Sequence, residues 1–104
     1  MISKDLLFIS GYNKISIINI NEYKIIREIE VPNSGWIHGA CLLNKNILFT
    51  GDEEGIIRRW KIEEDNSILI SKKENAHYSS IYTLINIGNG HIASGSDDNT
   101  IKIW

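Results

Sequence analysis

The feature that most constrains the fold of this sequence is a repeat whose two copies lie 44 residues apart. At this offset Thr50-Gly51 aligns with Ser94-Gly95, and Trp60 aligns with Trp104. The alignment runs from Asn33 to the end of the sequence without a gap. A repeat of this length indicates small structural units that stack on one another, because one unit alone cannot bury both of its faces.

A third and more divergent copy precedes these two. Ser10-Gly11 lies 40 residues before Thr50-Gly51. The turn that follows Ser10-Gly11 is shorter, so Ile15 aligns with Ile57 only after a gap of two residues. Ile18 then stands where both later copies have tryptophan. The first copy is therefore a weak version of the same unit.

Short apolar runs broken by Gly, Asn and Asp predict an all-β chain without helices. The joins between the runs are short, as at Tyr12-Asn13, Asn44-Lys45 and Gly88-Asn89-Gly90, and short joins favour antiparallel hairpins. We expect strands at Leu6–Gly11, Lys14–Ile20, Tyr23–Val31, Ile37–Leu43, Ile47–Gly51, Ile56–Ile62, Ser67–Lys73, Ser80–Ile87, His91–Ser96 and Thr100–Trp104.

Four strands in each 44-residue unit are typical of the blades of a β-propeller. We expect a partial propeller of about two and a half four-stranded antiparallel blades, forming one region over 1–104 with units at about 1–31, 32–75 and 76–104. A closed ring needs about four to eight blades. Either the sequence is a fragment of a longer propeller protein, which we favour, or several copies of the chain complete a ring together.

The charge and cysteine content restrict the partner and the compartment. The net charge of -2 argues against a nucleic-acid backbone or an anionic membrane as partner, because both attract a basic excess. Cys41 is the single cysteine and cannot form an internal disulfide, which fits a reducing compartment. The first ten residues lack the run of about 7–15 apolar residues of a secretory signal. These features predict a cytoplasmic or nuclear protein.

The segment from Ile92 to Trp104, with the sequence IASGSDDNTIKIW, closely resembles the most recognisable segment of the WD-repeat (WD40) family. The resemblance is strong in the third unit, clear in the second and weak in the first. It implies a hydrogen-bonded tetrad, which in the third unit consists of His77, Ser94, Asp98 and Trp104. Asp98 would hold the imidazole of His77 in one tautomer, and His77 would then meet Ser94 and the indole N–H of Trp104. Such a buried network stabilises only when every member is satisfied.

The same positions of the second unit are degenerate. They carry Asn33, Thr50, Glu54 and Trp60, of which only Trp60 is unchanged. We expect the first three to form a weaker substitute for the network. The aspartate that follows the tryptophan in the family is also missing, since Lys61 follows Trp60.

The resemblance implies a non-catalytic scaffold that binds a protein or peptide through loops on one face of the propeller. Trp36 either anchors such an interface or packs under a neighbouring loop. Arg59, beside Arg58, either binds a carboxylate or phosphate or pairs within the sheet with Glu53 or Glu54, and we favour the pairing. The expected partner contacts are Trp36, Glu53, Tyr78, Asp97 and Arg59.

Catalytic, metal and cofactor sites are not expected. His77, Asp98 and Ser94 could be drawn as a catalytic triad, but Ser94 lies on a predicted strand and no nucleophile elbow is present. His38-x-x-Cys41 lacks a second pair of ligands at metal spacing. The alternative function is that of a targeting or substrate-recruiting part of a larger enzyme or ubiquitin-ligase-type assembly, with its catalytic domain outside this chain.

Overall fold

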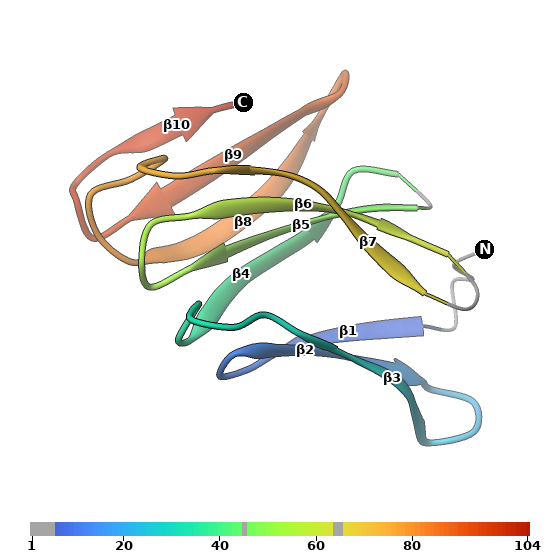
Figure 1. Ribbon diagram of the computed structural model, residues 1–104. Coiled ribbons are helices and arrows are strands. Elements are labelled where there is room, and N and C mark those ends of the chain that lie inside the picture. The colour runs from blue at the N-terminus through green and yellow to red at the C-terminus, as the bar shows by residue number, and fades with distance from the viewer. Residues whose placement is uncertain (1–5, 45, 64–65) are drawn as a thin grey trace.

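The structure is a computed structural model, and it describes residues 6–44, 46–63 and 66–104 (Figure 1). These residues form strands and turns only, so they include no helix that is long and apolar enough to cross a membrane. The prediction of an all-β chain is confirmed, and each strand end lies within one residue of its predicted position. Lys45 of the predicted Asn44-Lys45 turn, and residues 1–5 of the first unit, lie outside the described residues.

The strands form three antiparallel sheets, and hairpins join consecutive strands within each sheet. In Figure 1 the sheets follow one another as layers, with the four-stranded sheet in the middle. The first sheet contains β1 (Leu6–Ser10), β2 (Lys14–Asn19) and β3 (Lys24–Glu30). The middle sheet contains β4 (Ile37–Leu42), β5 (Ile47–Asp52), β6 (Ile57–Ile62) and β7 (Ser67–Lys73). The third sheet contains β8 (Ile81–Gly88), β9 (His91–Ser96) and β10 (Ile101–Ile103).

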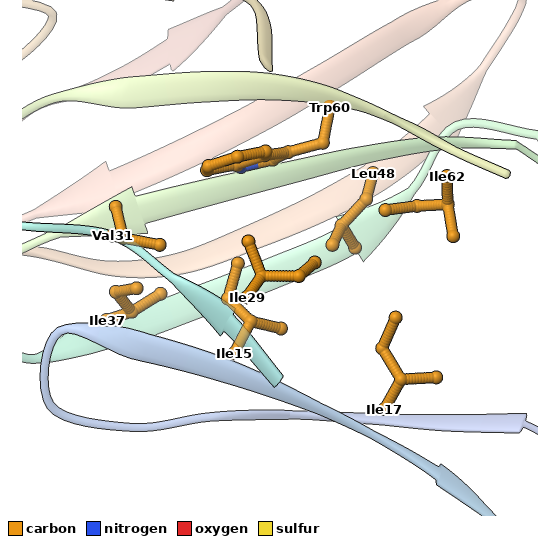
Figure 2. Packing of buried hydrophobic residues seen from close by; sticks show 8 residues of the cluster. All are labelled: Ile15, Ile17, Ile29, Val31, Ile37, Leu48, Trp60 and Ile62. Atoms are coloured by element: carbon orange, nitrogen blue, oxygen red, sulfur yellow. The ribbon is translucent and has the colours of Figure 1, made fainter. Parts of the chain in front are cut away.

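A hydrophobic cluster fills the space between the first and the middle sheet (Figure 2). Ile15 and Ile17 on β2 point the same way because side chains alternate along a strand. Full burial of one such side chain stabilises the fold by about 1.5–3 kcal/mol. The cluster consists of Ile15, Ile17, Ile29, Val31, Ile37, Leu48, Trp60 and Ile62.

A second cluster lies between the middle and the third sheet. It consists of Ile57, Ala76, Ile81, Leu84 and Ile92, with Cys41, Leu43, Phe49 and Trp104 packed beside them. The middle sheet thus buries both of its faces, Leu48 on one side and its neighbour Phe49 on the other. Burial on both faces by adjacent sheets is what the repeat predicts.

Gly51 allows the middle and the third sheet to approach closely. A Cβ atom at this position would lie 2.6 Å from Cγ2 of Ile81, which is closer than two carbon atoms can pack. The small residue that follows Thr50 in the repeat is therefore required by the packing of the next sheet.

Candidate functional site: a buried polar network and an exposed aromatic row

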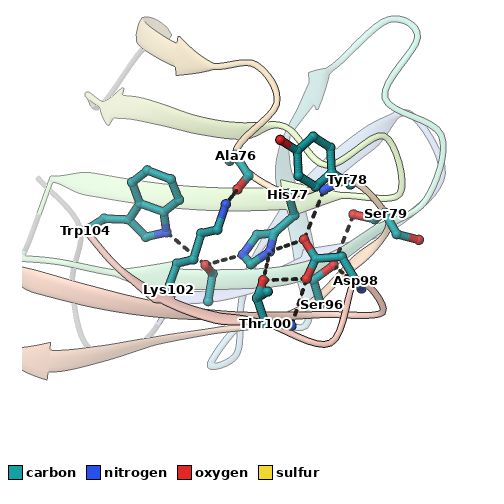
Figure 3. Close-up of polar contacts among 10 residues, drawn as sticks. Ala76, His77, Tyr78, Ser79, Ser96, Asp98, Thr100, Lys102 and Trp104 are labelled. Atoms are coloured by element: carbon teal, nitrogen blue, oxygen red, sulfur yellow. Dashed lines mark hydrogen bonds and ion pairs between the residues drawn. The ribbon is translucent and has the colours of Figure 1, made fainter.

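His77 lies in the segment between β7 and β8, and its imidazole is fully buried. Nδ1 lies 2.9 Å from Oδ2 of Asp98 (Figure 3). On the other side of the ring, Nε2 lies 2.7 Å from Oγ of Ser94. A carboxylate only accepts hydrogen bonds, so Nδ1 carries the proton and Nε2 accepts from the hydroxyl of Ser94. The indole N–H of Trp104 donates to the same Oγ over 2.8 Å, and not to His77 as expected. The structure therefore brings all four residues of the expected tetrad into one chain of hydrogen bonds.

Asp98 holds the turn between β9 and β10 against the segment before β8. Its side chain is 6% exposed, and Oδ2 accepts a hydrogen bond from the backbone N–H of Tyr78 over 3.0 Å. Burial opposes ionisation of this carboxyl group, but hydrogen bonds from Thr100, Tyr78 and His77 together hold its pKa well below the usual range. Asp98 is therefore an anion that fixes two backbone segments in place.

Thr100 belongs to the network although the sequence reasoning did not include it. Its backbone N–H donates to Oδ1 of Asp98 over 2.9 Å, and its hydroxyl group lies 3.0 Å from Nδ1 of His77. The spacing Asp-x-Thr at a turn was the available signal, because an aspartate accepts hydrogen bonds from the backbone two residues on. Ser94 is 1% exposed and both of its partners are internal, so the arrangement fixes loops and offers a substrate no access to the hydroxyl group.

The equivalent network of the middle sheet is only half formed. The indole N–H of Trp60 donates to Oγ1 of Thr50 over 3.1 Å. Asn33 is exposed and has a φ of 65°, and Glu54 is exposed at the tip of its turn. Within the described part of the chain, neither Asn33 nor Glu54 has a side-chain hydrogen bond to Thr50. The expected substitute of Asn33, Thr50 and Glu54 is therefore wrong, because these side chains do not converge.

A buried ion pair that the sequence reasoning missed fixes this turn instead. Oδ1 of Asp52 accepts the backbone N–H groups of Glu54 and Ile56 over 2.9 and 3.2 Å, and Oδ2 binds the guanidinium of Arg58. The two side chains are 1% and 8% exposed. Arg58 is thus already occupied and cannot form an anion site with Arg59. Arg59 is exposed and lies 6.0 Å from the ring centre of Phe49, without an ion pair to Glu53 or Glu54 among the described residues.

Four exposed ring side chains form a continuous row across all three sheets. Tyr12 and Trp36 meet edge to face with their ring centroids 5.2 Å apart. Trp36 and His38 lie at an interplanar angle of 20° with centroids 6.4 Å apart, and His38 and Tyr82 are 5.1 Å apart. We call Tyr12, Trp36, His38 and Tyr82 the aromatic row. A backbone bridge between Tyr12 and Trp36 joins the first sheet to the middle sheet at the same place.

Two carboxylates flank the aromatic row. The hydroxyl group of Tyr82 donates to Oδ2 of Asp97 over 3.0 Å, and this hydrogen bond and the charge of Asp97 raise the pKa of Tyr82. The backbone N–H of Glu53 donates to the carbonyl oxygen of Trp36 over 2.9 Å, and its carboxylate lies directly against Gly35. The row therefore combines exposed ring faces with negative charge at two points.

The structure brings three of the five expected partner contacts together, namely Trp36, Glu53 and Asp97. Tyr78 is 90% exposed, and its ring lies 5.9 Å from Nζ of Lys102. Within the described part of the chain, no ring contact joins Tyr78 to the aromatic row. Arg59 lies on β6, two strands away from the row on β4, and also makes no contact with it.

The sequence reasoning missed Tyr12, His38 and Tyr82. The 44-residue repeat carried a signal for two of them, because it aligns His38 with Tyr82. It also aligns Glu53 with Asp97, the two carboxylates beside the row. Trp36 and His38 are two residues apart, and such residues share one face of a strand. The position of Tyr12 depends on how the first sheet approaches the middle one, which the repeat does not specify.

Comparison with known proteins agrees with this geometry. The family model described as "WD domain, G-beta repeat" matches residues 66–104. THO complex subunit 6 of Drosophila melanogaster is 30% identical over 73% of this chain and 20% of its own length. Dynein axonemal assembly factor 10 of Bos taurus is 33% identical over 84% of this chain and 26% of its own length. This chain therefore spans about a fifth to a quarter of these relatives.

A solved structure shares the fold. A chain from the crystal structure of the mitotic checkpoint complex superposes with a TM-score of 0.82 at 22% sequence identity, over 96% of this chain and 30% of that chain. The three stacked antiparallel sheets are thus part of a WD-repeat propeller. With the repeat register, the matched family model and the propeller fold in agreement, this chain belongs to the WD-repeat family.

Proposed function

We propose that this chain is part of a non-catalytic scaffold for protein–protein interaction, and that the aromatic row with its two carboxylates is the surface that binds the partner. The exposure of Trp36 is the observation that carries this proposal, because half of a large ring stays in water beside other exposed rings. Aromatic residues of this kind are enriched among the few that dominate binding at interfaces. One relative is a subunit of the THO complex, and one structure with the same fold comes from the mitotic checkpoint complex, so both belong to assemblies.

Rigid support of the surface is consistent with this function. The His77 network fixes the third sheet at the end where Asp97 lies, and the Asp52–Arg58 pair fixes the turn that contains Glu53. A binding surface that is already ordered loses little conformational freedom when the partner arrives. The scaffold therefore presents its contacts in a fixed arrangement.

The organisation of the whole protein is part of the same proposal. We assign one propeller region over 1–104 with blade units at about 1–31, 32–75 and 76–104, and further blades of the same protein or other copies complete the ring. Ile101 and Ile103 on β10 are 79% and 62% exposed, and the exposure of these two apolar side chains supports a further blade that packs against β10. The net charge of -2 supports a protein or peptide partner rather than nucleic acid or a membrane. The single cysteine supports a location in the cytoplasm or nucleus.

An affinity pulldown with wild-type protein and the Trp36→Ala variant tests the proposal. We expect Trp36→Ala to lose the main partner, because truncation of a central aromatic anchor costs about 2 kcal/mol or more of binding energy. The matched control is Tyr23→Asn, which removes a ring that is 90% exposed in the turn between β2 and β3, far from the aromatic row. Asparagine tolerates the positive φ of 55° at this position. Identical partner lists for wild type and Trp36→Ala would contradict the proposed surface.

The alternative function, a targeting part of a larger enzyme or ligase-type assembly, is tested by the full-length reading frame, which shows whether a catalytic domain accompanies this region.

A further inference from the structure

We infer that the aromatic row binds an arginine side chain of the partner. This inference rests on the proposed function, since it names the chemistry that the same surface recognises. The observation behind it is the juxtaposition of exposed ring faces with two carboxylates, Glu53 and Asp97, across three sheets.

The rings supply faces on which a cation can lie. Tyr12, Trp36 and Tyr82 are 54%, 50% and 50% exposed, and His38 is also exposed. The electron-rich face of tryptophan attracts cations more strongly than that of any other side chain. Trp36 lies second in the row, with Tyr12 on one side and His38 on the other, so a cation over it remains close to further rings.

The carboxylates supply the opposite charge. Asp97 is exposed and tied to the row through the hydroxyl group of Tyr82, and Glu53 is half-buried against Gly35 next to Trp36. Within the described part of the chain, neither carboxylate forms an ion pair with a lysine or an arginine. Arg58 and Lys102 are engaged elsewhere, Arg58 with Asp52 and Lys102 with the carbonyl oxygen of Ala76. The negative charge of these two carboxylates is therefore not compensated within the surface, and a cation of the partner would compensate it.

The planar geometry favours arginine over lysine. A guanidinium group stacks flat on an aromatic ring and still donates hydrogen bonds in its own plane, in a fork that matches a carboxylate. An ammonium group is a more strongly hydrated point charge and loses more of its solvation on such a surface. Nearly parallel rings such as those of Trp36 and His38 present the flat faces that a guanidinium needs.

The three tryptophans of the chain provide a direct readout. The indole N–H groups of Trp60 and Trp104 are hydrogen-bonded inside the protein to Thr50 and Ser94, whereas the ring of Trp36 is exposed. In a ¹H–¹⁵N NMR spectrum of the full chain, Trp36→Phe assigns the indole signal of Trp36. The two internal indole signals then serve as controls for general unfolding or non-specific binding.

The probes are three blocked heptapeptides of glycine and serine that carry arginine, lysine or the neutral analogue citrulline at the centre. We expect the arginine peptide to shift the Trp36 signal saturably and to leave the other two indole signals in place. We expect about tenfold weaker binding of the citrulline peptide, since it keeps the planar shape but loses the charge. Binding of the lysine peptide should also be weaker than that of the arginine peptide.

Variants then test the carboxylates. Asp97→Asn and Glu53→Gln should each weaken binding of the arginine peptide several-fold, about the loss of one charge-assisted hydrogen bond. Glu54→Gln is the matched control, because it removes the same charge from the same turn at an exposed position without a contact to the row. Equal affinity for the three peptides, or no shift at Trp36, would overturn the inference. If the peptides show no arginine preference but the partner in the pulldown still depends on Trp36, only the arginine inference is wrong. If the partner does not depend on Trp36 either, the proposed binding surface is wrong as well.

Discussion

Asp52 and Arg58 form a buried ion pair in the middle sheet, at the two positions where the 44-residue repeat places Ser96 and Lys102 in the third sheet. Ser96 there accepts a hydrogen bond from the backbone N–H of Asp98 over 3.1 Å, and Lys102 donates to the carbonyl oxygen of Ala76 over 2.7 Å. Both sheets thus use polar side chains to fix the turn at the equivalent position of the repeat, but the chemistry differs. The middle sheet uses a strong charge pair where the third sheet uses the network around His77.

Loss of Arg58 should destabilise the chain strongly. The Arg58→Met variant keeps most of the volume of the side chain but leaves the carboxylate of Asp52 buried without its counter-charge. Breaking a buried pair in this way costs about 3–5 kcal/mol, and urea unfolding measures it. Arg59→Met is the matched control on the next residue of β6, and its exposed side chain should cost less than about 1 kcal/mol. Similar unfolding curves for the two variants would show that the pair does not stabilise the turn.

Truncation of His77 should also lower stability, by about 1–3 kcal/mol, because Asp98 and Ser94 lose a buried hydrogen-bond partner. Thermal or urea unfolding of His77→Ala measures the change. His38→Ala provides the control, since this imidazole is exposed and makes only ring contacts within the described residues. The control should stay within about 0.5 kcal/mol of wild type. A His77→Ala variant as stable as His38→Ala would mean that the network contributes nothing.

The stability of the chain should depend on pH through Asp98. Its folded-state pKa is lowered, so its contribution is complete above the pKa of about 3.9 of an unfolded aspartate and is lost as the pH falls toward the folded-state value. The Asp98→Asn variant has no carboxylate to protonate. We therefore expect the difference in unfolding free energy between wild type and Asp98→Asn to be largest at pH 7 and to shrink at pH 3. Urea unfolding at several pH values checks this, and a difference that stays constant down to pH 3 would exclude a lowered pKa of Asp98 in the folded state.

Local patterns in the sequence predicted most of the fold. Alternation of apolar residues, as at Ile15 and Ile17, and turn residues such as Gly88-Asn89-Gly90 define each strand through its own neighbours in the chain. The repeat then placed the units in register, and the resemblance named His77 and Asp98 as partners. The evidence for all of these features lies in the sequence itself.

Contacts that depend on geometry between side chains were not predictable in the same way. The partner of Arg58 was missed because the sequence offers three acidic residues at Asp52-Glu53-Glu54, and only the fold shows which one points inward. The aromatic row was missed for a related reason. Tyr12 reaches Trp36 through a bridge between two sheets, and the spacing of residues along the chain does not specify that approach.

The two glycines that the repeat aligns, Gly51 and Gly95, should respond differently to substitution by alanine. A Cβ atom at Gly51 would lie 2.6 Å from Cγ2 of the fully buried Ile81, whereas at Gly95 it would meet the exposed side chain of Thr83 at 3.0 Å. Overpacking between two sheets costs about 1–3 kcal/mol, so Gly51→Ala should lower the free energy of unfolding by that amount. Gly95→Ala should cost less, because Thr83 can rotate into solvent.

A double-mutant cycle with Ile81→Ala tests the cause of the difference. Removal of the Ile81 side chain takes away the atoms that the new Cβ atom would strike. The combined variant Gly51→Ala/Ile81→Ala should therefore lose less stability than the sum of the two single losses, as is usual for residues in direct contact. Gly95→Ala combined with Ile81→Ala should be additive, since Cβ at Gly95 meets no atom of Ile81. Additive losses in both pairs, measured by urea unfolding, would show that the close approach of the middle and third sheets does not explain the glycine at position 51.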